Sequence, residues 1–190
     1  HANTPLPEAF WGKKSGLLCL DHCVQKVLED GYTHHIPRLM ILANIATLLV
    51  IKPREITDWF WVMFIDAFEW VVEPNVLAMG TFATGEVLST KPYISGANYI
   101  NKMSDFCQSC SFDPKKNCPV TSVYWNFLEQ HKERFAHNFR MKMILKTLQR
   151  RTQEQKKHDR VVTAWLQHHL EKGVVVVAAK RPTLEHKAEI

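Results

Sequence analysis

Three of the five cysteines in this chain fall within a single short segment, residues 105–119, with the sequence DFCQSCSFDPKKNCP. Cys107 and Cys110 form a C-x2-C pair, and Cys118 stands directly before a proline. Two thiolates at this spacing bind one metal ion or one edge of a metal cluster without straining the backbone. The pattern therefore predicts a loop wrapped around a metal centre, with a redox pair or unpaired buried thiols as the alternative.

A fourth soft ligand for such a centre must come from elsewhere in the chain. Cys19 and Cys23 are the two remaining cysteines, and both fall in a segment with helical periodicity. Because they are four residues apart, they share one face of that helix. The spacing alone therefore leaves both as candidates.

Composition limits the class of protein to which this chain belongs. A hydrophobic content of 46% over 190 residues provides a core for one domain, or for one domain and a fragment. The net charge of +5 permits a polyanionic partner such as DNA without requiring one.

No apolar run reaches the ~18 residues of a membrane span. Five cysteines without a signal peptide favour a reducing, cytoplasmic compartment. Since the chain has no initiator Met, we expect a piece of a longer protein.

The apolar residues follow a helical period through most of the chain and predict an all-α fold. We expect an irregular lead-in over residues 1–14, anchored on the core by Phe10 and Trp11, then a helical domain over 15–172 and a tail over 173–190. A central helix, apolar nearly all round, should have Pro37 in its first turn and run to Leu49.

Ser15 should cap a helix over 15–30, and Gly31 should end it in the left-handed conformation. Lys52-Pro53 should start the next helix, which includes residues 56–72 and which residues 73–75 should break. The other predicted helices cover residues 96–103, 119–135, 139–150 and 152–172, with a long connection over 76–95.

Two groups of polar residues stand out in these apolar surroundings. Asp66 and Glu69 are three residues apart in the predicted helix 56–72, hence on one face. A buried carboxylate needs a partner, and Arg38 is the natural candidate for Asp66. Such a pair is either purely structural or aimed at a bound polar ligand. His34 and His35 stand at the start of the central helix. From residue type alone, their expected role is to cap that helix and to form hydrogen bonds there.

Residues 31–127 resemble the C-terminal half of the bacterial iron–sulfur photolyases and cryptochromes, the group called cryptochrome/photolyase-related. The resemblance covers about residues 4–150 and rests on segments in family order. These segments are GYTHHIPRLM (31–40), WVVEPNVLAM (70–79), STKPYISGANYINKMSD (89–105) and the cysteine loop with its continuation CPVTSVYWNFL (118–128). The chain departs from the family pattern at Val72, where many relatives carry Glu, and at Phe60, where Tyr is frequent.

The resemblance implies a helical FAD-binding domain of photolyase type, with a [4Fe-4S] cluster. Family spacing selects Cys19 over Cys23 as the fourth cluster ligand beside Cys107, Cys110 and Cys118. The residues implied to bind FAD are Arg38, Asp66, Glu69, Asn75 and Met79.

The resemblance also implies a function, the light-driven repair of UV-damaged DNA, most closely of the (6-4) type. His34 and His35 would meet the DNA lesion as catalytic residues, and Trp59 and Tyr99 would carry electrons to the flavin. The family places an N-terminal α/β antenna domain before this point, and we expect this chain alone to be inactive. Two alternatives remain: a blue-light cryptochrome sensor domain, and a non-catalytic helical interaction module that a bound metal stabilises.

Overall fold

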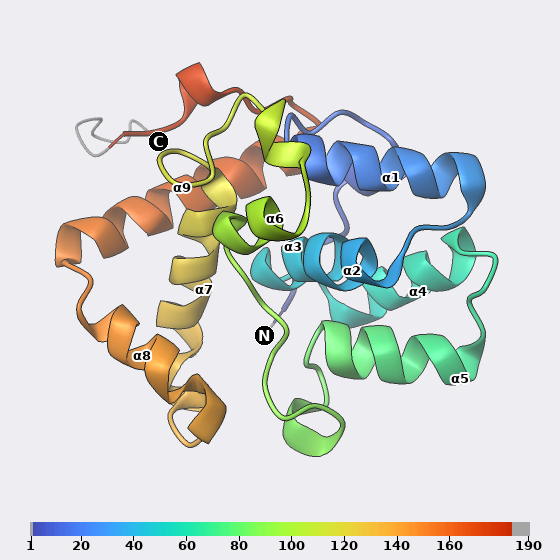
Figure 1. Ribbon diagram of the computed structural model, residues 1–190, viewed down its shortest axis with the longest axis horizontal. Coiled ribbons are helices and arrows are strands. Elements are labelled where there is room, and N and C mark those ends of the chain that lie inside the picture. The colour runs from blue at the N-terminus through green and yellow to red at the C-terminus, as the bar shows by residue number, and fades with distance from the viewer. Residues whose placement is uncertain (1, 184–190) are drawn as a thin grey trace.

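The computed structural model describes residues 2–183, and over this range the fold is all-α, as predicted (Figure 1). The described residues form no β-strand, and Thr4 and Ile51 make an isolated parallel bridge. None of the described helices combines the length and the apolar character that a membrane crossing requires. The α-helices are α1 (Leu18–Asp30), α2 (His35–Pro37), α3 (Asn44–Leu48), α4 (Pro53–Met63), α5 (Glu69–Val72), α6 (Ala97–Met103), α7 (Pro119–Phe135), α8 (Lys142–Gln149) and α9 (Gln153–Glu171).

Shorter or wider helical turns connect these helices. The π-helical segments are η2 (Arg38–Ala43) and η3 (Glu73–Gly80). The 3-10 segments are η1 (Glu8–Trp11), η4 (Gly85–Val87), η5 (Phe106–Gln108), η6 (Phe139–Met141) and η7 (Ala178–Lys180).

The central helix is continuous through α2, η2 and α3. Pro37 lies in its first turn, where the missing N–H has no intrahelical partner to lose. Leu42 and Ala46 are fully buried, and Asn44 is also buried, with its amide donating to the Ser95 carbonyl oxygen at 3.0 Å. The prediction of a helix that is apolar nearly all round, and therefore central, is confirmed.

The predicted helix over residues 56–72 is wrong in its bounds. The chain begins α4 at Pro53, as Lys52-Pro53 predicted, but it leaves the helix at Phe64 and restarts it at Glu69. The predicted break at residues 73–75 is also wrong, because α5 continues directly into η3 through Pro74. A wide π turn tolerates the proline, which would remove a hydrogen bond from a regular helix interior. Asp66 therefore lies in a break between helices, and the face it was expected to share with Glu69 does not exist.

The start of α1 also differs from the prediction. Ser15 does not cap the helix, which begins at Leu18. Instead the Asp21 carboxylate accepts hydrogen bonds from the Ser15 N–H at 2.7 Å, the Ser15 hydroxyl at 2.6 Å and the Gly16 N–H at 3.1 Å. Asp21 thus fixes the turn that leads to Cys19, and no side chain of the described residues caps the first turn of α1. Gly31 ends the helix in the left-handed conformation, as predicted.

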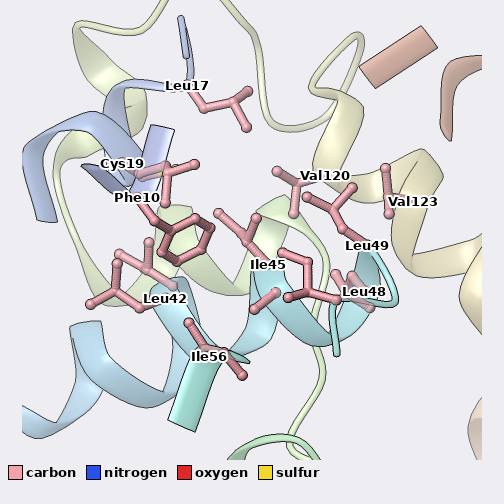
Figure 2. Packing of buried hydrophobic residues seen from close by; sticks show 14 of the residues in the cluster. Phe10, Leu17, Cys19, Leu42, Ile45, Leu48, Leu49, Ile56, Val120 and Val123 are labelled. Atoms are coloured by element: carbon pink, nitrogen blue, oxygen red, sulfur yellow. The ribbon is translucent and has the colours of Figure 1, made fainter. Parts of the chain in front are cut away.

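The hydrophobic core joins the lead-in to α1, the central helix, α4 and α7 (Figure 2). Phe10 meets the Trp59 ring edge-on at 5.4 Å, and the Trp59 indole N–H donates to the Phe10 carbonyl oxygen at 2.9 Å. Of the two lead-in residues expected to anchor on the core, Phe10 is buried, whereas Trp11 is 55% exposed. In Figure 2, the side chains of Leu42 and Ile56 are drawn below the Phe10 ring.

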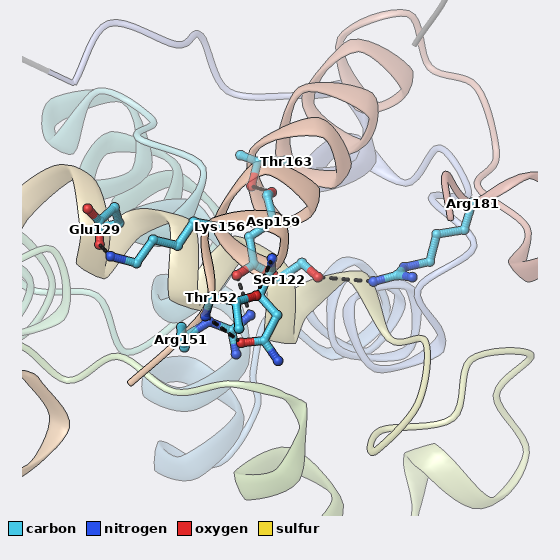
Figure 3. Close-up of polar contacts among 9 residues, drawn as sticks. Ser122, Glu129, Arg151, Thr152, Lys156, Asp159, Thr163 and Arg181 are labelled. Carbon is cyan, nitrogen blue, oxygen red and sulfur yellow. Dashed lines mark hydrogen bonds and ion pairs between the residues drawn. The ribbon is translucent and has the colours of Figure 1, made fainter. Parts of the chain in front are cut away.

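Helices α7 and α9 pack along each other and are tied by buried polar contacts (Figure 3). Thr152 begins α9 with a capping box that includes Gln155. Arg151 pairs with Asp159, whose side chain is 5% exposed, and the Arg151 guanidinium lies 4.9 Å from the centre of the Trp125 ring. Burial raises the pKa of Asp159, and Arg151 opposes that rise. The pair is therefore a buried one, in which each charge depends on the other.

Replacing Asp159 by Asn should strongly destabilise the protein, because the buried Arg151 charge loses its partner. We expect a loss of about 3 kcal/mol in the free energy of unfolding, measured by urea denaturation. Asp58→Asn, which breaks the more exposed pair with Arg54, is the matched control and should cost much less. Equal losses in the two variants would contradict a buried, interdependent pair.

Candidate functional site

Four cysteines from three parts of the chain line one small cavity of about 10 Å³. Cys19 lies in the first turn of α1, Cys107 in η5, Cys110 in the following loop, and Cys118 is the N-cap of α7. All five cysteines are free thiols. The structure brings together the four residues that the family resemblance selected. Cys23, one turn further along α1, is buried but does not line this cavity.

The loop between Cys110 and Cys118 is shaped by its own hydrogen bonds. The Asp113 carboxylate accepts from the backbone N–H groups of Lys115 at 2.7 Å and Lys116 at 3.0 Å. The Asp113 carbonyl oxygen accepts from the Cys118 N–H at 2.9 Å. Phe112 is buried and anchors the loop on the core. The loop geometry that carries Cys118 back to Cys19 is therefore set by an Asp-centred turn and one aromatic anchor.

Burial raises the pKa of the Cys19, Cys107 and Cys118 thiols. At Cys19 the neighbouring sulfurs of Cys118, Cys23, Cys110 and Cys107 raise the pKa further. Burial raises the pKa of Cys118 to about 12. Bound cationic iron would remove this mutual repulsion, so the donor set fits a metal cluster chemically. Within residues 2–183, however, no three or more His, Cys, Asp or Glu side chains form a group arranged to hold a metal ion.

A second site lies at the start of the central helix, where Arg38 and Asp66 form a bidentate ion pair. The Nη1–Oδ1 and Nη2–Oδ2 distances are both 2.9 Å, which confirms the predicted partnership. The Arg38 Nε–H donates to the Thr33 carbonyl oxygen at 2.6 Å. The guanidinium also lies 4.3 Å from the centre of the Phe64 ring and 4.7 Å from that of Tyr32. The Arg38 side chain is thus held in one orientation by an ion pair, a backbone hydrogen bond and two ring contacts.

This pair is less buried than expected. The side chain of Asp66 is 45% exposed and that of Arg38 is 20% exposed. An exposed ion pair contributes little to stability. Its bidentate geometry holds both side chains in one orientation beside an open cavity.

The cavity beside the pair has a volume of about 200 Å³. Its polar lining comes from Arg38, Asp66, His35 and Asn75, with Met79 among the apolar residues. Asn75 is oriented by its own helix, since its amide donates to the Val71 carbonyl oxygen at 2.8 Å. The arrangement is an apolar hollow with a few convergent polar groups, the usual character of a small-molecule site.

Two predicted residues do not reach this cavity. Glu69 is exposed on α5 and is not among the lining residues. His34 is also exposed outside the cavity, and its ring meets Tyr32 edge-on at 5.6 Å. Of the two adjacent histidines, His35 alone lines the cavity.

A chain of aromatic contacts connects Trp59 to the cavity. Trp59 is buried and meets Phe60 at 5.3 Å and Phe64 at 5.9 Å between ring centres. Phe60 and Phe64 are stacked, with 4.8 Å between ring centres and an interplanar angle of 4°, and both line the cavity. Tyr99 lies elsewhere, beside a separate cavity of about 110 Å³ that Phe106 also lines.

Three residues of this second site were not singled out from the sequence in this role. Phe60, Phe64 and Tyr32 enclose the ion pair or line the cavity. The density of aromatic residues over 59–70 is the signal that points to Phe60 and Phe64, whereas it does not include Tyr32. It does not say which rings face the cavity, because the helix breaks at Phe64 and changes the face.

No family model matches the chain. It is 40% identical over 159 residues to a (6-4) photolyase of Agrobacterium fabrum, an alignment that covers 81% of this chain and 31% of the photolyase. It is also 32% identical over 115 residues to an uncharacterized protein of Acanthamoeba polyphaga mimivirus, covering 60% of this chain and 90% of that protein. The chain therefore spans about a third of the length of the photolyase that it matches. It belongs to the photolyase family, as its motifs indicated, and corresponds to the C-terminal part of these proteins.

Proposed function

We propose that this chain is the C-terminal flavin and [4Fe-4S] portion of a light-driven DNA-repair photolyase of the (6-4) type. The observation that carries the proposal is the cavity at the start of the central helix, where Arg38, Asp66, Asn75 and His35 converge. It occurs in a chain that is 40% identical to a (6-4) photolyase. The substrate would be UV-damaged DNA, and the N-terminal antenna domain would be the partner.

In this proposal, the chain provides one wall of the FAD site. The cavity of about 200 Å³ is smaller than a typical ligand site of about 300–1,000 Å³, so other parts of a longer protein would complete it. Arg38, Asp66 and Asn75 would hold the polar edge of the isoalloxazine ring. Phe60 and Val72 would offer it an apolar surface. Glu69 is not part of the proposed site, because it lies outside the cavity.

FAD, when reduced and excited by light, supplies the electron that splits the DNA photoproduct. To reach the site, the damaged bases must leave the duplex and enter a pocket. His35 lines the cavity and would hold a proton at a ring nitrogen, ready for the oxygen of the lesion where negative charge develops. His34 is exposed beside it and would contact the lesion from outside.

Electron delivery from the protein would use Trp59, with Tyr99 as a later step. Trp59 is excluded from water, and its ring contacts both members of the stacked pair that lines the cavity. Tyr99 is partly exposed on α6, which suits a residue that exchanges electrons with solvent donors.

For the cysteine site, we propose a [4Fe-4S] cluster held by Cys19, Cys107, Cys110 and Cys118. Support comes from their common cavity and from their soft thiolate donors, the ligand type that holds iron–sulfur clusters. The cluster would join α1 and the cysteine loop to the start of α7. Its role would be structural or electron-buffering, because four thiolates leave no open coordination position.

The cluster proposal predicts a sharp difference between two neighbouring cysteines. Protein purified without oxygen should contain iron and acid-labile sulfide and show broad visible absorption. Cys19→Ala should lose the cluster, since no other thiol of α1 lines the cavity, whereas Cys23→Ala should keep it. Loss of iron in both variants, or zinc in place of iron, would contradict the proposal. Zinc without flavin would favour the non-catalytic module.

The flavin proposal predicts that Asp66 contributes to FAD affinity through Arg38. Asp66→Asn should raise the dissociation constant for FAD by about 10- to 100-fold, the effect of losing a charged hydrogen bond. Flavin fluorescence titration measures this constant. Asp58→Asn is the control, because Asp58 is paired on the exposed side of α4 and does not line the cavity. Equal affinity in Asp66→Asn and the unchanged protein would refute the assignment.

The repair proposal predicts that His35 acts on the damaged DNA. In a longer protein in which this chain is joined to the parts that complete the FAD site, illumination with reduced FAD should repair an oligonucleotide that carries one (6-4) photoproduct. His35→Ala should slow this repair by about 100-fold, the effect expected for a general acid. His168→Ala, on the remote helix α9, should leave it unchanged. Flavin binding with no repair by that completed protein would favour the cryptochrome sensor.

A further inference from the structure

A further cavity lies at the other end of the central helix from the candidate flavin site. Its volume is about 680 Å³, against about 200 Å³ for the cavity beside Arg38. Thr47, Val50 and Ile51 line it from the end of α3 and the turn that follows, and residues of α7 line it as well. None of the described residues lines both cavities. The volume falls within the range of about 300–1,000 Å³ that is usual for small-molecule sites.

The part of this cavity that α7 provides is a stripe of three rings. Phe127, His131 and Phe135 are spaced four residues apart and therefore share one face of the helix. The centre of the His131 ring lies 4.4 Å from that of Phe127 and 6.4 Å from that of Phe135. Phe82, from the loop after η3, adds a fourth ring at 6.3 Å from Phe135. Such a surface suits a flat aromatic ligand, because aromatic rings pack favourably with their centres about 4.5–7 Å apart.

Two residues that line this cavity have a strained backbone. Val50 and Phe82 are the two non-glycine residues with a positive φ in the described chain, and the angle is 56° in both. Val50 lies in a Schellman turn after α3. Its N–H donates to the Thr47 carbonyl oxygen at 3.0 Å, and the Ile51 N–H donates to that of Ala46 at 3.0 Å. Glycine is the usual residue at this position, and a β-branched residue is costly there. Strain of this kind gathers at ligand sites.

Two basic side chains of this cavity lack a partner. The Nε2 atom of His131 is buried and accepts or donates no hydrogen bond within the described part of the chain. Arg134, three residues later on the same helix, is exposed and forms no ion pair with any described residue. The Thr47 hydroxyl, by contrast, already donates to the Gly80 carbonyl oxygen at 3.1 Å. A buried polar atom without a partner is costly, so a ligand that supplied one would be favoured.

The charge of this cavity favours an anion. None of its described lining residues is acidic, and Arg134 contributes a full positive charge. Burial and the charge of Arg134 both lower the pKa of His131, so the two basic groups oppose each other when the cavity holds no anion. An anionic group beside them would pair with Arg134 and accept a hydrogen bond from His131.

We propose that this cavity is a binding site for a small planar aromatic molecule that carries an anionic group. The rings of Phe82, Phe127 and Phe135 would pack against the planar part. Arg134 and the Nε2 of His131 would hold the anion. The site is separate from the candidate flavin site and does not rest on the proposed function.

The anion preference is tested by calorimetric titration with two probes that share one ring system, 1-naphthyl phosphate and the uncharged 1-naphthol. The phosphate should bind with one-to-one stoichiometry and about 10-fold more tightly than 1-naphthol, the effect of one charged hydrogen bond. Arg134→Gln should remove this preference. Arg140→Gln should keep it, because Arg140 lies on η6 and does not line the cavity. Equal affinities of the unchanged protein for the two probes, or no binding of either, would overturn the proposal.

His131→Phe keeps a ring in the stripe and removes the unpartnered nitrogen. This variant should bind 1-naphthyl phosphate several-fold more weakly and 1-naphthol with unchanged affinity. Its urea unfolding midpoint should not fall, because no hydrogen bond within the described chain is lost. His168→Phe, on the remote helix α9, is the matched control and should keep both affinities. An unchanged affinity of His131→Phe for the phosphate would overturn the assignment of the anion to His131.

Ala2 and Asn3 line the same cavity, so a preceding part of a longer protein is the competing occupant. The same titrations on a longer protein, joined to this chain at residue 1, distinguish the two occupants. Binding of 1-naphthyl phosphate that still depends on Arg134 would support the small-molecule site. Loss of that binding on joining would overturn it in favour of packing between two parts of one protein.

Discussion

The burial of the central helix on all sides is the constraint on which the rest of this structure depends. Its apolar residues require neighbours in every direction, and α1, η3 and α7 supply them. Once these neighbours are in place, the start of the helix projects beyond the core. That end carries His35 and Arg38, which therefore reach the cavity while the remainder of the helix packs. Packing of one element thus creates the polar end of the candidate flavin site.

The break between α4 and α5 has a comparable effect on the chemistry of the site. A continuous helix would have kept Asp66 on a regular face with Glu69. The break instead turns Asp66 back to Arg38 and stacks Phe64 on Phe60. Two parallel hydrogen bonds and two flanking rings hold the ion pair in a fixed orientation beside the cavity.

The two candidate sites are connected through a shared layer of side chains. Phe106 and Ile100 line both the cysteine cavity and the cavity beside Tyr99, and Met40 and Ile41 of η2 line the latter as well. The cysteine site therefore packs against the central helix through shared side chains.

The sequence by itself determined the helical class, the central position of one helix and the bounds of α7, because apolar periodicity reports burial directly. Family spacing also separated Cys19 from Cys23, which share a helix face. The sequence did not reveal the break at Phe64, the continuation of the helix through Pro74 or the position of Glu69 outside the cavity. Only the tertiary structure decided these, because a local pattern cannot say which backbone turns widen to satisfy packing. The contacts of Val176 with Gly16 and of Arg181 with Ser122 were not predicted either, because a contact between distant segments of the chain produces no pattern within either segment.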